Sequence, residues 1–189
     1  IRANMTNLDL FAMNTISQNT RTAVLEKLSS LGMKLYGKST WHESSNKTIR
    51  EIYDSMAVYS IAHTENVYNR SKINLNISHV QANGGFPWRI TDILASNGLL
   101  VSDFSIKETI REVFPHASIP LYETKQEAYD ICKKYINNDN MRKDAVCLQN
   151  ELIDYRFRFD YALKRIGDLI GKDIVGNNSE LMTNELIEN

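Results

Sequence analysis

The sequence predicts an α/β domain in which a mostly parallel sheet of about five to six strands carries helices on both faces. Residues 99–101 are uniformly apolar, which is typical of a strand buried on both sides of a parallel sheet. Elsewhere, segments with apolar residues at helical spacing alternate with short strand-like runs. This alternation favours parallel strands that are joined by helical crossovers.

The N-terminal part contains the first predicted crossover. We expect the apolar run 8–13 to form the first strand and residues 20–31 to form a helix that ends at Gly32. Residues 33–36 then form a second strand. A strand, a helix and a strand within about 30 residues make up the parallel crossover unit.

The loop after this second strand carries three candidate ligand-binding residues, Gly37, Lys38 and Trp41. In open α/β sheets, ligands bind at the carboxyl ends of the strands. Lys38 is suited to a phosphate contact, and Trp41 to covering a flat ring. The alternative is a solvated Lys38 and a Trp41 that packs on the edge of the sheet, because aromatic side chains are mostly packing residues.

The next strand is predicted to carry amides on one face. A helical pattern over 46–56, a brief strand at 58–60 and a helix over 61–71 lead to the alternating run 73–77. Its Asn74 and Asn76 either hold loops together or bind a ligand. His79 follows, and a lone histidine in such a position is more often a hydrogen-bonded structural group than a catalyst.

A glycine pair, a short helix and a helix stop follow in residues 84–98. Pro87 suits the first turn of this helix, and Asn97 and Gly98 end it. A helix that starts behind a glycine loop presents free N–H groups to an anion, and Arg89 adds a positive charge there. Asp92 shares a helix face with Arg89. Together they form either part of a ligand site or an ordinary surface ion pair, which contributes little to stability.

The C-terminal half continues the alternation of helices and strands. Ser105 with Glu108, and Thr124 with Glu127, have the spacing of capping boxes. They predict helices through residue 114 and over 124–135, with a last strand at 119–122 between them. A turn at 137–140 and a largely helical segment over 145–170 are expected to follow. Cys132 and Cys147 lie in helical patterns without metal-ligand spacing, so we expect two free, buried thiols.

Composition limits the possible functions of the chain. Its 189 residues and net charge of −1 indicate one globular domain without a broad nucleic-acid footprint. No run has transmembrane length, no signal peptide is visible, and no metal-binding cluster or cofactor motif occurs. We expect a cytoplasmic chain, or one that associates with a membrane through other parts of the protein. Because the chain starts at Ile1 rather than Met, we expect a fragment.

Two stretches carry a family resemblance. Residues 73–77, together with the pattern that follows them, resemble the C-terminal domain of GT-B glycosyltransferases, and most closely the CgeB-like (spore-maturation-protein) branch of the family 1-like enzymes. The segment Leu35-Tyr36-Gly37-x-x-x-Trp41 resembles the glycine–tryptophan loop of that branch. The resemblance covers about residues 8–171. The longer pattern reads Gly85-x-Pro87-x-Arg89-x-x-Asp92-Ile93-Leu94-Ala95-x-x-Gly98-x-Leu100-Val101-x-Asp103.

The resemblance implies a Rossmann-like three-layer sandwich over residues 1–171, followed by an acidic tail at 172–189. It implies a nucleotide-sugar donor bound to this domain and a carbohydrate, lipid-linked or protein acceptor held by a separate N-terminal domain. The carboxylate of Asp92 would bind the hydroxyls of the donor ribose, although the family usually has Glu at this position. Arg89 would bind the diphosphate. Gly84 stands where the broader family pattern has a glutamate on the transferred sugar.

The predicted function is therefore that of the donor-binding half of a metal-independent glycosyltransferase, with no cofactor other than its nucleotide-sugar substrate. The catalytic base is expected on the absent domain. One alternative is a non-catalytic nucleotide- or carbohydrate-binding module of the same fold. A receiver-like signalling domain is disfavoured because residues 11–14 offer no acidic cluster. The predicted donor-binding residues are Gly37, Lys38, Trp41, Asn76, His79, Gly85, Phe86, Trp88, Arg89 and Asp92.

Overall fold

The computed structural model describes residues 6–56, 60–80, 85–153, 157 and 159–172. The chain divides into two compact units, Ile1–Leu152 and Ile153–Asn189, which are treated separately below. The first unit contains the sheet and most of the helices.

The sheet consists of three parallel strands in the described residues. They are β1 (Ile73–Asn76), β2 (Leu99–Asp103) and β3 (Leu121–Tyr122), in the order β1-β2-β3. In the register of the β1–β2 pair, Asn76 lies opposite Ser102. The pairing of β2 with β3 covers only two residues on each strand. The predicted strands 73–77, 99–101 and 119–122 are thus confirmed in position and direction.

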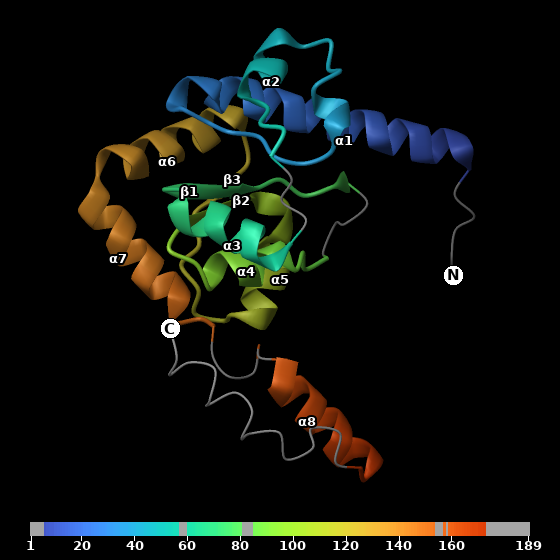
Figure 1. Cartoon of the computed structure of the whole chain (residues 1–189), viewed down its shortest axis with the longest axis vertical. Coiled ribbons are helices and arrows are strands. Elements are labelled where there is room, and N and C mark those ends of the chain that lie inside the picture. The colour runs from blue at the N-terminus through green and yellow to red at the C-terminus, as the bar shows by residue number, and fades with distance from the viewer. Residues whose placement is uncertain (1–5, 57–59, 81–84, 154–156, 158, 173–189) are drawn as a thin grey trace. The chain divides into compact units, whose positions relative to one another are not determined.

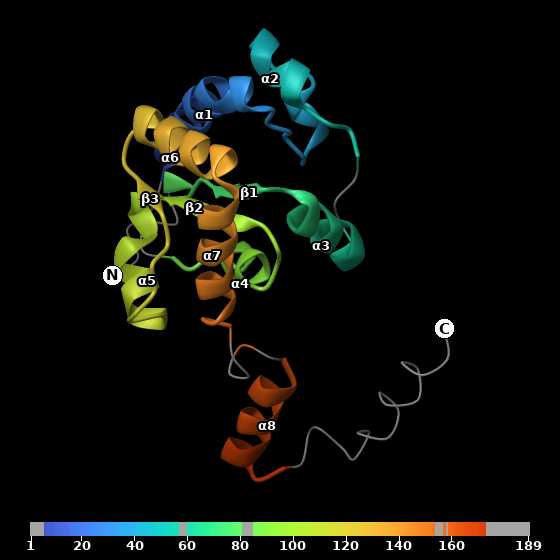
Figure 2. The same cartoon turned by 90° about the vertical axis from the view of Figure 1, so that its left-hand side faces the viewer.

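Helices cover both faces of this sheet, as Figures 1 and 2 show. On one face lie α1 (Asn7–Leu28) and α6 (Lys125–Asn137), and on the other lie α4 (Arg89–Leu94) and α5 (Lys107–Val113). Next to α4 runs α7 (Asp139–Asn150). This three-layer arrangement confirms the predicted Rossmann-like α/β fold class.

The core follows from the alternation of side chains along the strands. Leu99 and Val101 of β2 pack with Val24 and Leu28 of α1 on one face, and Cys132 of α6 joins them. On the opposite face, fully buried residues come from β2, from α4 and from the 3-10 turn that follows β2. These residues are Leu100, Ile90, Ile93, Leu94 and Ile106.

The connecting segments form short helices. They are η1 (Ser29–Leu31), η2 (Ser39–Trp41), α2 (Lys47–Ile52), α3 (Ile61–Arg70) and η4 (Phe104–Ile106). A small cluster of Leu25, Ile49 and Ile52 joins α2 to α1. None of the helices in the described part of the chain is long and apolar enough to cross a lipid bilayer.

The prediction for the N-terminal part is wrong in two places. Residues 8–13 belong to the 22-residue helix α1, which Thr6 and Asp9 open with a reciprocal capping box. Residues 33–36 form no strand of the sheet, because Leu35 makes only an isolated parallel bridge to Tyr53. Of the strand predicted at 58–60, residues 58 and 59 lie outside the described residues, and Ser60 caps α3.

Two predictions for the C-terminal half also need correction, whereas the segment 145–170 is largely helical as predicted, with α7 ending at Asn150 and α8 spanning Phe159–Ile170. The N-cap of α5 is Ile106, without a side-chain bond, so Ser105 and Glu108 form no capping box. Both cysteines are free as predicted, but Cys147 is exposed. The capping box of Thr124 with Glu127 is confirmed.

Gly98 is required by close packing rather than by a left-handed helix cap. Helix α4 ends at Leu94, and the positive φ values among the described glycines occur elsewhere. A Cβ on Gly98 would lie 2.0 Å from the Nδ2 of Asn74 and 2.5 Å from the carbonyl oxygen of Tyr68. Only glycine lets β2 begin this close to the end of α3.

The side-chain amides of Gln149 and Asn150, both on α7, form hydrogen bonds with backbone groups in the same region. Gln149 is buried, and its Oε1 accepts the N–H of Leu100 at 2.9 Å while its Nε2 donates to the Leu100 carbonyl at 3.1 Å. Because β3 is too short to pair with this part of β2, the glutamine amide takes the place of a neighbouring strand. Asn150 donates to the carbonyls of Leu94 and Ser96 at the end of α4.

The second unit contains α8. Within it, Ile166, Leu169 and Ile170 are exposed, with Leu169 at 82%. The predicted acidic tail, from residue 173 onward, lies outside the described residues.

Candidate functional site

The carboxyl ends of the three parallel strands meet at one edge of the sheet. Asn76 ends β1, Asp103 ends β2 and Tyr122 ends β3. The hydroxyl of Tyr122 donates to the carbonyl oxygen of Asn76 at 3.3 Å. Burial strongly raises the pKa of Tyr122, which keeps this hydroxyl a donor. In open α/β sheets this edge is where ligands bind.

Asp103 holds the ends of β1 and β2 together. Its Oδ2 accepts the backbone N–H of Ser78 at 2.6 Å, and its Oδ1 accepts that of Ser105 at 3.1 Å. The carboxylate therefore fixes both the loop that leaves β1 and the 3-10 turn that leaves β2. The sequence suggested Asp103 only as part of the family pattern, without a role.

Helix α1 also reaches this edge. The Nη2 of Arg21 donates to the carbonyl oxygen of Ile77 at 3.4 Å, and the hydroxyl of Ser17 accepts the N–H of Val80 at 3.0 Å. Burial, followed by the positive charge of Arg89, lowers the pKa of Arg21, while Asp103 opposes the shift. Arg21 thus lies within electrostatic range of both charges. Sequence reasoning missed it because the segments are far apart along the chain.

Arg89 and Asp92 are both exposed on α4, on the shared face that their spacing predicts. Among the described residues, neither side chain forms a salt bridge or a hydrogen bond, with each other or with a third group. The ordinary surface ion pair is therefore not formed. Desolvation raises the pKa of Asp92, which is consistent with a carboxylate that has lost water without gaining a partner.

Tyr68 of α3 lies near both of these charged residues. Desolvation raises the pKa of its phenol, Arg89 opposes the rise and Asp92 adds to it. From the sequence, Tyr68 was only one of the residues in the helix predicted over 61–71. Its side chain joins α3 to the surroundings of Arg89 and Asp92.

The asparagines of β1 act mainly as structural links. Asn74 donates to the carbonyl oxygen of Tyr68 at 3.1 Å, and Asn76 donates to the hydroxyl of Ser102 at 2.8 Å. Asn76 is fully buried, yet its Oδ1 has no partner among the described residues, and the same holds for the hydroxyl of Ser78. His79, which follows, is half-buried.

The loop before α4 divides into buried and exposed residues. Phe86 packs against Phe114 with ring centroids 6.0 Å apart, whereas Trp88 is 84% exposed. Gly84 lies outside the described residues, between Val80 and Gly85. Helix α4 has only six residues, so its dipole is small and charge at this place comes mainly from side chains.

The glycine–tryptophan loop is fixed by Tyr53 and by an apolar cluster of α1 and α2. The carbonyl of Gly37 accepts the hydroxyl of Tyr53 at 3.3 Å, and Trp41 is half-buried against the cluster of Leu25, Ile49 and Ile52. Trp41 therefore packs against residues of α1 and α2, and Lys38 is exposed.

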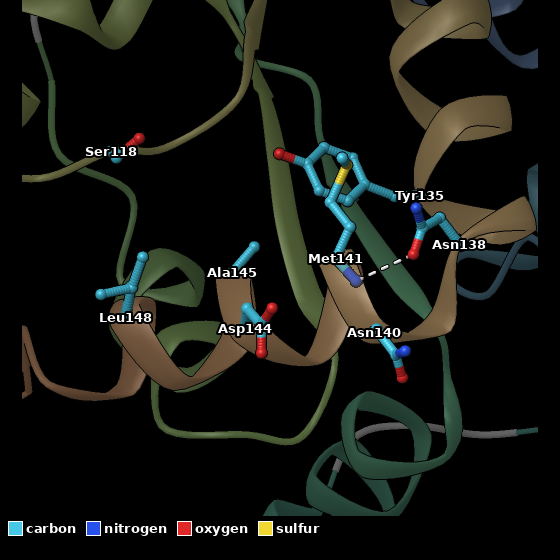
Figure 3. A pocket seen from close by; sticks show the side chains of 8 residues that line it. All are labelled: Ser118, Tyr135, Asn138, Asn140, Met141, Asp144, Ala145 and Leu148. Atoms are coloured by element: carbon cyan, nitrogen blue, oxygen red, sulfur yellow. Dashed lines mark hydrogen bonds between the residues drawn. The ribbon is translucent and has the colours of Figure 1, made fainter.

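A separate hollow of about 480 Å³ lies where α6 meets α7 (Figure 3). Tyr135, Met141 and Leu148 contribute to its lining, and Ser118 faces it from the segment before β3. None of the predicted donor-binding residues lines it. It therefore does not coincide with the candidate site at the carboxyl edge of the sheet.

Comparison with known families gives one match. A family model described as glycosyl transferase-like matches residues 20–156. No curated protein and no solved structure matches the chain significantly. The matched region contains all three strands and every predicted donor-binding residue. The chain therefore belongs to the glycosyl transferase-like family, and this membership supports glycosyl transfer as its general activity.

Proposed function

We propose that this chain is the donor-binding half of a metal-independent GT-B glycosyltransferase, which moves a sugar from a nucleotide-sugar to an acceptor held by a separate domain. The observation that carries this proposal is the pair Arg89 and Asp92 on α4. Both residues lie on one face of a helix that follows β1 in the chain, and neither forms a salt bridge or a hydrogen bond with a described residue. Membership of the glycosyl transferase-like family adds independent support.

In this reaction the bond between the sugar C1 and the diphosphate oxygen breaks, and the diphosphate leaves with the electron pair. An acceptor hydroxyl forms the new bond to C1 and gives its proton to a base, which we place on the separate domain. The positive charge of Arg89 stabilises the charge that develops on the leaving diphosphate, because a fixed cation needs no reorganisation at that moment.

Asp92 acts on a different part of the donor. A carboxylate is an acceptor only, and its two oxygens match the paired hydroxyls of a ribose. Partial desolvation, which raises its pKa, also strengthens the hydrogen bonds that it accepts. Arg89 therefore binds the diphosphate of the nucleotide, and Asp92 binds its ribose.

Calorimetric titration of two variants tests this assignment. Arg89→Ala is expected to weaken nucleoside diphosphate binding about ten- to a hundredfold while affecting nucleoside much less, since a hydrogen bond to a charged group contributes roughly 1.5–3 kcal/mol. Asp92→Asn is expected to weaken both ligands and to reduce the preference for ribose over deoxyribose.

Arg111→Ala is a matched control, because Arg111 pairs with Glu108 on the exposed surface of α5. It should leave nucleotide affinity unchanged. Wild-type affinity for nucleoside diphosphates in the Arg89 variant would overturn the proposed donor site. Sugar transfer to an acceptor by residues 1–189 alone would contradict the placement of acceptor and base on another domain, and binding that never leads to transfer with any added domain would favour the non-catalytic module.

A further inference from the structure

The hollow between α6 and α7 is built from helices and from the segment before β3, not from the ends of β1 and β2 (Figure 3). Its volume of about 480 Å³ lies within the range of small-molecule pockets, which begins at about 300 Å³. Its lining shares no residue with the predicted donor site. A ligand held there would therefore be separate from the donor and would not depend on the proposed function.

Hydrogen bonds fix the two helices that form the walls of the hollow. Asn138 caps α7, because its Oδ1 accepts the backbone N–H of Met141 at 3.0 Å. Arg142 is buried, and its Nη1 donates to the carbonyl oxygen of Tyr135 at 3.4 Å and also binds the carboxylate of Asp139. The last turn of α6 and the first turn of α7 are thus held together, so a ligand does not have to order the walls when it binds.

The polar side chains around the hollow have hydrogen-bonding capacity left. The carboxylate of Asp144 and the amide of Asn140 form no hydrogen bond or salt bridge with a described residue. The same holds for the hydroxyls of Ser118 and Tyr135. Asn138 uses its Oδ1 for the helix cap, which leaves its NH₂ group as a donor. The lining therefore offers donors and acceptors together, which suits a ligand with hydroxyl groups, because a hydroxyl both donates and accepts.

Apolar surface lies between these polar groups. Met141 and Leu148 are exposed, Ala145 is half-buried, and all three line the hollow (Figure 3). The lining contains one carboxylate, that of Asp144, and no cationic side chain, although Lys134 lies over the ring of Tyr135 at 5.8 Å. A ligand with a negative charge would be repelled by Asp144, so the hollow favours a neutral molecule.

We propose that this hollow binds a ring of a neutral saccharide. A sugar ring has hydroxyl groups along its edge and C–H groups on its faces, and the hollow combines polar groups with apolar surface in a matching way. Asp144 accepts hydrogen bonds from the hydroxyls, while Met141 and Leu148 pack against the C–H groups. The ring can belong to a free monosaccharide or to a longer glycan, since both present the same chemistry.

NMR titration of the isotope-labelled chain with the methyl glycosides of glucose, galactose, mannose and N-acetylglucosamine tests this proposal. We expect at least one glycoside to shift the backbone amide signals of Asn140, Asp144 and Ala145 in a saturable way. Asp144→Asn retains the size of the side chain but loses its charge, and it should weaken binding about tenfold or more. Asp130→Asn is the matched control, because Asp130 is exposed on α6 and accepts from Gln126 outside the hollow.

Three further arms sharpen the test. Ser118→Trp adds a large ring at an exposed position of the lining and should abolish the shifts. Glucose 6-phosphate should bind more weakly than methyl glucoside, because of the charge of Asp144. Maltose and cellobiose distinguish the two sources of the ring, since a disaccharide that binds more tightly than methyl glucoside indicates a glycan and equal affinity indicates a single sugar.

The outcomes separate the saccharide site from the donor site. The absence of saturable shifts around the hollow with all four glycosides overturns the saccharide site, as does wild-type affinity in Asp144→Asn or tighter binding of glucose 6-phosphate. Ser118→Trp should leave nucleoside diphosphate binding unchanged, and Arg89→Ala should leave glycoside binding unchanged. Loss of the glycoside shifts in Arg89→Ala would place the sugar at the donor site and overturn the assignment to the hollow. If the glycosides bind at the hollow but no nucleoside diphosphate binds the chain, the saccharide site stands and the proposed function fails.

Discussion

The two ends of the β1–β2 pair differ in their polar groups that lack a partner among the described residues. At the amino end, polar side chains are matched with backbone groups: Asn74 bonds the Tyr68 carbonyl, and Gln149 bonds both backbone groups of Leu100. At the carboxyl end, Asp103 is also matched with backbone N–H groups, but the charged groups of Arg89 and Asp92 have no partner among the described residues, and two buried polar atoms are unsatisfied. One end therefore contributes mainly to stability, and the other retains capacity for a ligand.

This difference predicts which substitutions affect folding and which affect binding. Changes at the amino end should lower the free energy of unfolding, because they remove satisfied contacts or introduce collisions. Changes of Arg89 and Asp92 at the carboxyl end should leave that free energy nearly unaltered and act on affinity. The three predictions that follow test the comparison, in order of decreasing effect.

Gly98→Ala should have the largest effect. The added Cβ would meet Asn74 Nδ2 at 2.0 Å and two backbone carbonyls, those of Tyr68 and Ser71, at 2.5 and 2.7 Å. Since backbone atoms cannot move aside cheaply, we expect a loss of about 3 kcal/mol or more in denaturant unfolding. Asn97→Ala, at the exposed neighbouring position, should change stability by less than about 0.5 kcal/mol. Equal stability of the two variants would contradict the tight packing at Gly98.

Gln149→Leu should have the next largest effect. It retains an apolar bulk but leaves the N–H and C=O of Leu100 buried without partners, which we expect to cost about 2–3 kcal/mol. Gln126→Leu is the control, because Gln126 makes its amide bonds to Asp130 on an exposed helix surface, where they contribute only a few tenths of a kcal/mol. If both variants unfold at the same denaturant concentration, the glutamine does not replace a strand.

The smallest effects concern two carboxylates whose pKa values move in opposite directions. Arg142, through hydrogen bonding and charge, lowers the pKa of Asp139, and Lys72 at the start of β1 adds to this shift. Stability from Asp139 is therefore present above the unfolded pKa and lost as the pH falls through the folded one. For Asp92, with its raised pKa, stability instead falls as the pH rises from the unfolded value through the folded one.

Unfolding experiments at about pH 7 and about pH 3 measure these signs. Asp139→Asn should destabilise the chain at the higher pH and have little effect at the lower one. Asp92→Asn should be neutral or slightly stabilising at the higher pH, with the difference vanishing in acid. A destabilising Asp92→Asn at the higher pH would show that Asp92 has a partner within the fold.

Much of the central fold was predictable because its signals are local. The buried run at 99–101, the alternation at 73–77 and the capping box of Thr124 with Glu127 all depend on neighbouring residues. The strand predicted at 8–13 failed because a short apolar run does not distinguish strand from helix. The capping pair of Thr6 with Asp9 was the signal that favoured the helix.

The candidate site was predictable only in part. The placement of Arg89 and Asp92 on one face of a short helix follows from their spacing, and the structure agrees. Arg21, Asp103 and Tyr68 were missed because their proximity depends on how distant segments pack, which periodicity does not encode. Trp41 was proposed as a ligand-binding residue because an aromatic ring can cover a flat ligand. In the structure it packs against an apolar cluster.

The bonding of Gln149 to β2 has a consequence for association between molecules. Beyond the two-residue pairing with β3, the N–H and C=O of Leu100 would offer a template to which another chain could add a strand. A glutamine side chain occupies both groups, and it cannot itself be extended by further pairing. The sheet is thereby closed to edge-to-edge growth at this point, so the amide protects the protein from aggregation as well as stabilising it.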